Sequence, residues 1–209
     1  MEKRNWKRSV TLKQRMVLCL AAFFAAFALQ LALNGYQARA VQQVQDDQMS
    51  NFNAISRFQG GVESSISILE AYRWENGETE EMLEKLQAAC STSNAWLWRI
   101  RSNMDGLQNV SDEQWVLYGA VETTYGSYNT LLEELENYLS SGQEAKASQL
   151  YYNKVSVCGV YLSQYTMQLL KASILDAQTT YTEISELGER IALMQIVVVA
   201  LCVALGCAS

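Results

Sequence analysis

Apolar residues recur every three or four positions along most of the chain, which is the spacing of helix faces. Residues 112–139 show this best, with a seven-residue repeat at Tyr118, Val121, Tyr125, Tyr128, Leu132, Leu135 and Leu139. Residues 79–105 repeat in the same way at Leu83, Leu86, Cys90, Ser93, Leu97, Ile100 and Met104. Longer stripes run along residues 34–74 and 143–190, the latter through Val155, Cys158, Leu162, Tyr165, Leu169 and Ala172. The sequence has few alternating runs of β-branched residues, which would indicate strands. The pattern therefore predicts an all-α protein.

Short turn signals separate these four stretches. Ser111 and Gln114 are spaced as a capping box, in which the serine oxygen accepts a backbone bond and the glutamine reaches back. Gly106 is expected to end the second helix in the left-handed conformation. Short turns make neighbouring helices antiparallel, and repeats of 3.5 residues favour crossing angles near 20°. The sequence therefore predicts an antiparallel four-helix bundle over residues 34–190.

Two apolar runs flank the predicted bundle. Met16–Leu33 and Ile191–Ala208 each contain 18 residues without a charge, which at the rise of a helix is roughly 27 Å. We expect both to be transmembrane helices. A cleavable signal peptide is the main alternative for residues 16–33, but its apolar region is typically shorter. The fourth stripe enters residues 191–208 without a break, which predicts one continuous helix.

Charge is distributed unevenly along the chain. Residues 1–15 hold six basic residues and one acidic residue, whereas the whole chain has a net charge of −6. A basic head before an apolar run predicts a cytoplasmic N-terminus. The expectation is a two-pass plasma-membrane protein, with residues 34–190 outside the cell and the chain continuing beyond Ser209. The folded body lacks a basic cluster, so a nucleic-acid partner is not expected.

The composition favours binding over catalysis. The chain contains no histidine, which is the commonest general base and metal ligand, and no proline. No phosphate loop, serine elbow or metal-binding pair occurs, so we expect neither an enzyme nor a cofactor. Glutamates at the start of the second helix are interpreted as partners of the helix dipole.

A few side chains are candidates for a site. Arg73 and Trp74, at the end of the first helix, could hold an anionic or aromatic ligand. Cys90 and Cys158 fall at similar heights and could form a redox pair, although two buried thiols is the favoured interpretation. The tyrosines of the last two helices could line a cavity, although a place in the core is favoured.

Two segments carry a resemblance to a known class. Glu70-Ala71-Tyr72-Arg73-Trp74-Glu75-Asn76-Gly77 and Val110-Ser111-Asp112-Glu113-Gln114, in this layout, resemble the sensor portion of YesM/LytS-type histidine kinases. Chemoreceptors share the four-helix sensor. The resemblance implies a cytoplasmic HAMP linker, a histidine-bearing dimerisation helix and an ATPase domain, none of which lies in these 209 residues.

The leading hypothesis for function is a sensory input module of a receptor, most consistent with a sensor histidine kinase. A stimulus would change helix packing and shift the last helix by ~1–2 Å. The expected partners are the lipid bilayer, a second copy of the chain, and an unidentified extracellular ligand or binding protein. The alternatives are a chemoreceptor sensor domain and a membrane scaffold that does not signal.

Overall fold

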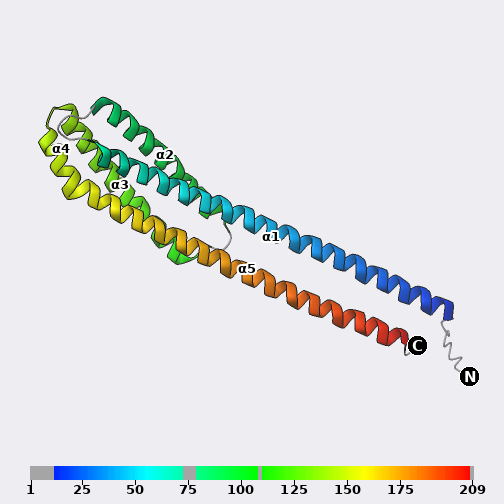
Figure 1. The fold of residues 1–209 in the computed structure, drawn as a ribbon. Coiled ribbons are helices and arrows are strands. Elements are labelled where there is room, and N and C mark those ends of the chain that lie inside the picture. Colours follow the sequence, from blue (N-terminus) through cyan, green and yellow to red (C-terminus); the bar gives the residue numbers. More distant parts are fainter. Residues whose placement is uncertain (1–11, 73–78, 108–109, 208–209) are drawn as a thin grey trace, which may run out of the picture. The chain divides into compact units, whose positions relative to one another are not determined.

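All regular structure in the described part of the chain is helical. The computed structural model describes residues 12–72, 79–107 and 110–207. Its elements are α1 (Leu12–Ala71), α2 (Thr79–Gly106), α3 (Asp112–Ser140), α4 (Glu144–Leu150), the π-helical turn η1 (Tyr151–Val155) and α5 (Ser156–Cys207) (Figure 1). The prediction of an all-α protein is confirmed for these residues.

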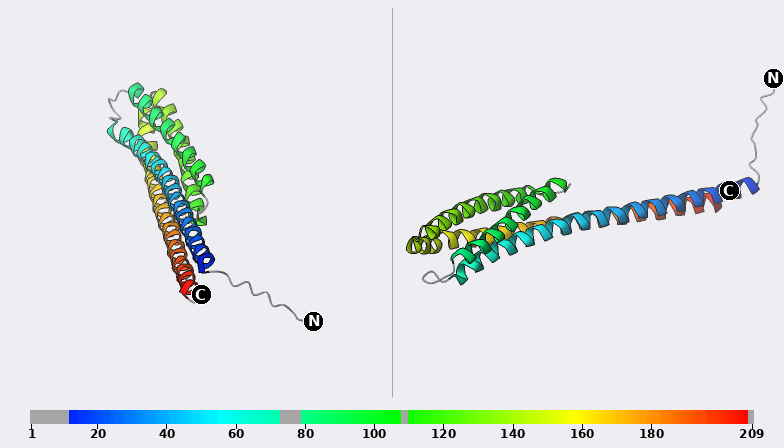
Figure 2. Two further views of the ribbon diagram at one scale, coloured as in Figure 1. Left: turned by 90° about the vertical axis from the view of Figure 1, so that its right-hand side faces the viewer. Right: turned by 90° about the horizontal axis from the view of Figure 1, so that it is seen from above.

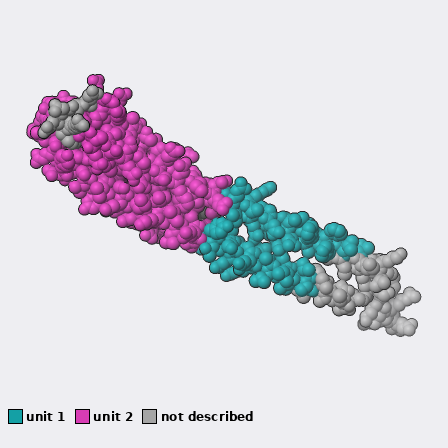
Figure 3. Space-filling view, viewed as in Figure 1, with its two compact units in different colours: residues 1–43, 181–209 teal, residues 44–180 magenta. Residues whose placement is uncertain are grey.

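The chain divides into two compact units. Residues 44–180 form one of them, which we call the core unit, and residues 1–43 with 181–209 form the other, the terminal unit (Figure 3). The core unit contains α2, α3, α4 and η1 together with parts of α1 and α5. The predicted boundaries at residues 34 and 190 differ from these limits.

The membrane location is not upheld. A search of the described residues finds no helix with both the length and the apolar character that crossing a bilayer requires. The two charge-free runs are 18 residues long, at the short end of the range for spans, and each contains a glutamine, Gln30 or Gln195. The predicted two-pass plasma-membrane location, with a cytoplasmic N-terminus and residues 34–190 outside the cell, is therefore wrong.

The seven-residue repeat of α3 forms the centre of the core unit. All seven predicted positions, from Tyr118 to Leu139, are buried. On α2, the repeat is buried at Leu86, Ser93, Leu97, Ile100 and Met104, whereas Leu83 and Cys90 are half-buried. Figure 2 shows α2 and α3 beside the parts of α1 and α5 that complete this unit. The repeat spacing predicted these two helices nearly residue by residue.

The buried stripe of α5 is displaced from the predicted one. Four of the six predicted positions are buried as expected, namely Val155, Leu162, Leu169 and Ala172, but Cys158 and Tyr165 are only half-buried. The positions between them are filled by the more polar Gly159, Thr166 and Ser173. Hydropathy alone missed this face because two of its members are hydroxyl residues. Thr166 remains paired through a bond from its hydroxyl to the carbonyl of Leu162, at 2.8 Å.

Two small residues let helices approach closely. A Cβ at Gly61 of α1 would collide with the hydroxyl of Ser93 on α2. A Cβ at Gly159 of α5 would stand 3.0 Å from Cδ1 of Ile66 on α1. A larger residue at either position would require the facing side chain to move, so the two glycines allow α1 to lie close to α2 and α5.

The start of α3 is capped differently from the prediction. Ser111 is the N-cap and its hydroxyl accepts the backbone N–H of Gln114 at 3.3 Å, as expected. The backbone N–H of Ser111, however, donates to Oδ2 of Asp176 on α5 at 3.1 Å. The side chain of Gln114 is buried instead of reaching back. A carboxylate 65 residues away thus replaces the local half of the capping box.

Gly142, rather than the predicted Gly106, is the glycine that ends a helix in the left-handed conformation. Gly142 has a φ of 69°, and the N–H of Gln143 donates to the carbonyl of Tyr138 at 2.8 Å. With the bond from Gly142 to Leu139, this is a Schellman motif closing α3. Gly106 ends α2 without a positive φ, so its predicted left-handed conformation is wrong.

The last long helix is interrupted near its start. A helix without a break was expected from Gln143, but the π-helical turn Tyr151–Val155 separates α4 from α5. A π turn inserts an extra residue and rotates the following face. This rotation carries Gly159 rather than Cys158 to the buried side. From Ser156 to Cys207 the helix is continuous, as predicted.

The long-range cap gives a test of the α3–α5 contact. We expect Asp176→Asn to lower the free energy of unfolding by about 1 kcal/mol, because a charge-assisted bond at a helix N-terminus becomes a neutral one. Asp112→Asn is the matched control, since Asp112 lies exposed in the same first turn of α3. Urea unfolding of both variants measures the difference. Equal losses would contradict a specific role for Asp176.

Candidate binding groove between α2 and α3

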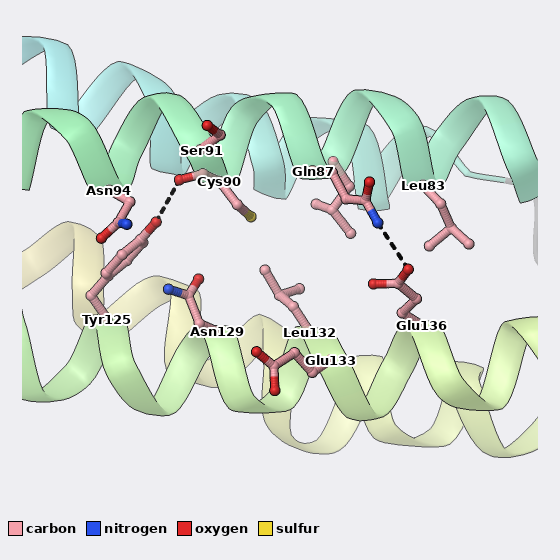
Figure 4. A pocket seen from close by; sticks show the side chains of 11 residues that line it. Leu83, Gln87, Cys90, Ser91, Asn94, Tyr125, Asn129, Leu132, Glu133 and Glu136 are labelled. Carbon is pink, nitrogen blue, oxygen red and sulfur yellow. Dashed lines mark hydrogen bonds between the residues drawn. The ribbon is translucent and has the colours of Figure 1, made fainter.

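The described surface of the core unit contains a hollow between α2 and α3. Its cavity volume is about 310 Å³ (Figure 4). It is lined by side chains from these two helices only: Leu83, Leu86, Gln87, Cys90, Ser91, Asn94, Tyr125, Asn129, Leu132, Glu133 and Glu136. We call this hollow the α2–α3 groove.

The helix repeats explain which residues line the groove. Leu86 and Leu132 belong to the buried stripes of their helices and form an apolar floor. Gln87, one position later, and Glu136, one turn further along α3, lie beside those stripes at the rim. The groove thus arises where two amphipathic faces meet at their polar edges.

Two hydrogen bonds join the walls of the groove. The hydroxyl of Tyr125 donates to the backbone carbonyl of Cys90 at 2.8 Å, and Nε2 of Gln87 donates to Oε1 of Glu136 at 2.9 Å. Figure 4 shows these bonds at two places along the groove, with Asn129, Leu132 and Glu133 between them. The bonds hold the spacing of the two helices while leaving the space between them open.

The charged groups that line the groove are all carboxylates. Oδ1 of Asn129 is buried and has no hydrogen-bond partner in the structure. Glu133 and Glu136 add two carboxylates, and the lining contains neither lysine nor arginine. A buried carbonyl oxygen without a partner is costly, so a donor placed there by a ligand is favoured. The groove suits a molecule with an apolar part and N–H donors, preferably cationic.

The thiol of Cys90 is held in its protonated form. Burial, followed by the nearby carboxylate of Glu136, raises its pKa from 9.0 to about 11. Burial likewise raises the pKa of the Tyr125 hydroxyl to about 12. Because the thiolate is the nucleophile and metal ligand, Cys90 has little of either activity at neutral pH.

The structure separates the predicted site residues. Arg73 and Trp74 lie outside the described residues. Cys90 lines the α2–α3 groove, whereas Cys158 lines a different hollow between α3 and the start of α5. Both are free, half-buried thiols, and burial raises the pKa of Cys158 as well. The redox pair stays a prediction.

The amides of the groove escaped the sequence analysis. Gln87, Asn94 and Asn129 looked like ordinary surface residues next to the apolar repeats. Gln87 and Asn94 are seven residues apart, as are Asn129 and Glu136, so each pair occupies one edge of its helix. A polar stripe beside an apolar stripe on two consecutive helices was the available signal.

Comparisons with protein-family models, curated proteins and solved structures give no match to this chain. Among the described residues, no group of three or more Cys, Asp or Glu side chains is arranged to hold a metal ion. The groove and the two helices that form it are therefore the features that bear on function.

The raised pKa values predict a loss of stability at alkaline pH. The native state keeps Cys90 and Tyr125 protonated, while the unfolded chain releases these protons near pH 9 and 10. The contribution of these two protonated groups to the free energy of unfolding is therefore fully present below about pH 9. It is lost as the pH rises toward 11–12. Urea midpoints measured from pH 8 to 11 should show this fall, and it should be smaller in Tyr125→Phe. An identical fall in that variant would contradict the assignment.

Proposed function

We propose that this chain is a sensory input module of a signal-transduction receptor, and that the α2–α3 groove is its ligand site. The supporting observation is the groove itself, a hollow of about 310 Å³ with an apolar floor and a partnerless acceptor. Such a combination is typical of small-molecule sites. The module binds and responds, and chemical work is done by other domains or partners.

The arrangement of the core unit that we propose is an antiparallel four-helix bundle of α1, α2, α3 and α5. The hydroxyls of Tyr72 and Thr79 are 2.7 Å apart, and Gly61 of α1 meets Ser93 of α2, which supports opposite directions for these helices. The bond between Ser111 and Asp176, together with the packing of Gly159 against Tyr128, supports the same relation for α3 and α5. In a bundle, a ligand between two helices changes the packing of all four.

The proposed output is phosphoryl transfer by a sensor histidine kinase. The chain contains no histidine, so the accepting residue must lie outside these 209 residues. The support is the resemblance of the helical layout, together with α5, which leaves the core unit as an unbroken helix. A chemoreceptor output would use the same input module.

The groove proposal predicts selective binding of cationic ligands. We expect aliphatic and aromatic amines to raise the melting temperature of the protein, whereas carboxylic acids of similar size do not. The double variant Glu133→Gln/Glu136→Gln should bind the best amine at least tenfold more weakly, because both carboxylates of the groove become neutral amides. Titration calorimetry measures the affinity.

The matched control for this experiment is Glu134→Gln. Glu134 lies on α3 between the two groove carboxylates in sequence but does not line the groove. Replacing it removes one negative charge from the chain without changing the lining of the groove. The affinity for the amine should therefore stay within about twofold of the wild-type value. Equal weakening by both variants would reduce the effect to general electrostatics. No stabilisation by any amine would contradict the groove as the ligand site.

A second copy of the chain is the proposed partner, and α5 supplies the contact. Its outer side within the core unit carries apolar residues that are 41–59% exposed. They are Val157, Val160, Tyr161, Met167, Ile174 and Leu175. Val160, Met167 and Ile174 follow a seven-residue repeat, as at coiled-coil seams. Together the six form one exposed apolar surface on α5, and a standard interface takes ~800 Å² from each partner.

The dimer is tested by charge insertion on this face. Val160→Glu/Ile174→Glu should weaken self-association at least tenfold, because two carboxylates would be buried without partners. Val116→Glu is the control, since Val116 is 71% exposed on α3 and belongs to no such repeat. Sedimentation equilibrium distinguishes monomer from dimer. A wild-type monomer at all concentrations would contradict the proposal.

A further inference from the structure

A group of buried polar side chains lies in the half of the core unit where α3 begins. Gln48 and Asn51 of α1, Gln114 of α3 and Ser173 of α5 are each more than nine-tenths buried. Asn103 of α2 is half-buried. We call these five residues the polar layer. None belongs to the α2–α3 groove.

The packing of α1 on α2 brings two of these residues to one level. Gly61 and Ser93 face each other across the pair. Asn51 is ten residues before Gly61, and Asn103 is ten residues after Ser93. Because the helices run in opposite directions and rise equally per residue, Asn51 and Asn103 lie at the same height.

The α3–α5 contact brings two more residues together. Ser111 meets Asp176 through the bond of 3.1 Å that caps α3. Gln114 is three residues after Ser111, and Ser173 is three residues before Asp176. One helical turn from the cap, both side chains are therefore at the same height.

The third contact joins the two pairs. Ile66 of α1 lies against Gly159 of α5. Asn51 is fifteen residues before Ile66 and Ser173 is fourteen residues after Gly159, again in opposite directions. All four long helices thus contribute a polar side chain to one cross-section of the core unit.

The polar layer contains six buried atoms without a hydrogen-bond partner. The acceptors are Oε1 of Gln48, Oδ1 of Asn51 and Oε1 of Gln114. The donors are Nδ2 of Asn51, Nδ2 of Asn103 and the hydroxyl of Ser173. None of these groups carries a charge. Three donors and three acceptors suit a neutral molecule that can both donate and accept hydrogen bonds.

Elsewhere in the core unit, a buried polar pair is satisfied directly. The hydroxyls of Ser65 on α1 and Tyr128 on α3 are 2.9 Å apart, and Ser65 also donates to the carbonyl of Val62. The polar layer has no such bonds, although Asn51 is fully buried with both amide atoms available. Groups that stay unpaired at one level of a core are those that water bridges.

We propose that the polar layer binds a cluster of internal water molecules. Since a buried water makes about three hydrogen bonds, the six atoms accommodate about two waters. The waters link all four helices at this cross-section, where direct side-chain bonds are absent. The layer is an internal hydration site and stands independently of the α2–α3 groove.

The hydration has a consequence for movement, which rests on the proposed function. A water bridge can lengthen or change partners when a helix shifts by 1–2 Å, whereas close-packed side chains resist such a shift. The hydrated layer is then the place where α5 can move relative to α1 and α3. The Ser65–Tyr128 level acts as the fixed part.

Oxygen-17 relaxation dispersion on the full chain tests the hydration directly. We expect about two long-lived internal waters in the wild type, and their loss in Asn51→Leu/Gln114→Met/Ser173→Ala. Thr166→Val is the matched control, because Thr166 is equally buried on α5 but has a carbonyl partner. It should retain the waters.

The relaxation measurement uses no ligand, so its result does not depend on whether the α2–α3 groove binds an amine. A wild-type protein without long-lived water overturns the proposal. Waters that persist in the triple variant overturn it too, because they would then lie elsewhere. If the triple variant does not fold, the single change Ser173→Ala must still lower the signal, and an unchanged signal again overturns the proposal.

Discussion

Burial of the tyrosines on α3 is the constraint on which the core unit depends. A buried phenol contributes a large apolar area, but its hydroxyl needs a partner. Tyr125 donates to the backbone of α2 at Cys90, and its ring packs edge-on against Phe58 of α1, with centroids 5.2 Å apart. Tyr128 meets Ser65 of α1. Each bond therefore fixes a neighbouring helix against α3.

The α2–α3 groove follows from this arrangement. The bond from Tyr125 sets the distance between α2 and α3 at one place, and the bond between Gln87 and Glu136 sets it at another. Between these bonds the side chains do not fill the space, and about 310 Å³ remains open. The same burial that orders the helices raises the pKa of Cys90 and Tyr125, so both side chains stay protonated at neutral pH.

Buried polar side chains of the core unit differ in whether they have a hydrogen-bond partner within the protein. At the level of Tyr128 and Ser65 they pair directly, and Gly159 of α5 packs there against Ile66 and the ring of Tyr128. At the level of Asn51 and Ser173 they have no protein partner. If water fills the second level as we propose, the two levels differ in how firmly they hold the helices together, since regions with fewer direct contacts open at a lower free-energy cost.

The repeat on α3 was readable in advance because every member is apolar or aromatic and the helix is buried along its length. The stripe on α5 was not, since the π turn at Tyr151–Val155 changes the phase of the helix and hydroxyl residues occupy the buried face. The prediction that Gln114 would complete the cap of α3 was wrong for a related reason. Gln114 has the right spacing for a local bond, but Asp176 provides a charged acceptor that no local pattern contains.

By itself, the sequence determined that the chain is helical and roughly where the turns between the helices lie, because helical periodicity and turn formation act over a few residues, but it did not reveal the π turn at Tyr151–Val155. It could not establish a membrane location, which absence of charge suggested but the described helices do not support. Only the tertiary structure decided which side chains share a cross-section or a groove. Those pairings join residues tens of positions apart, and their spacing comes from the packing of whole helices.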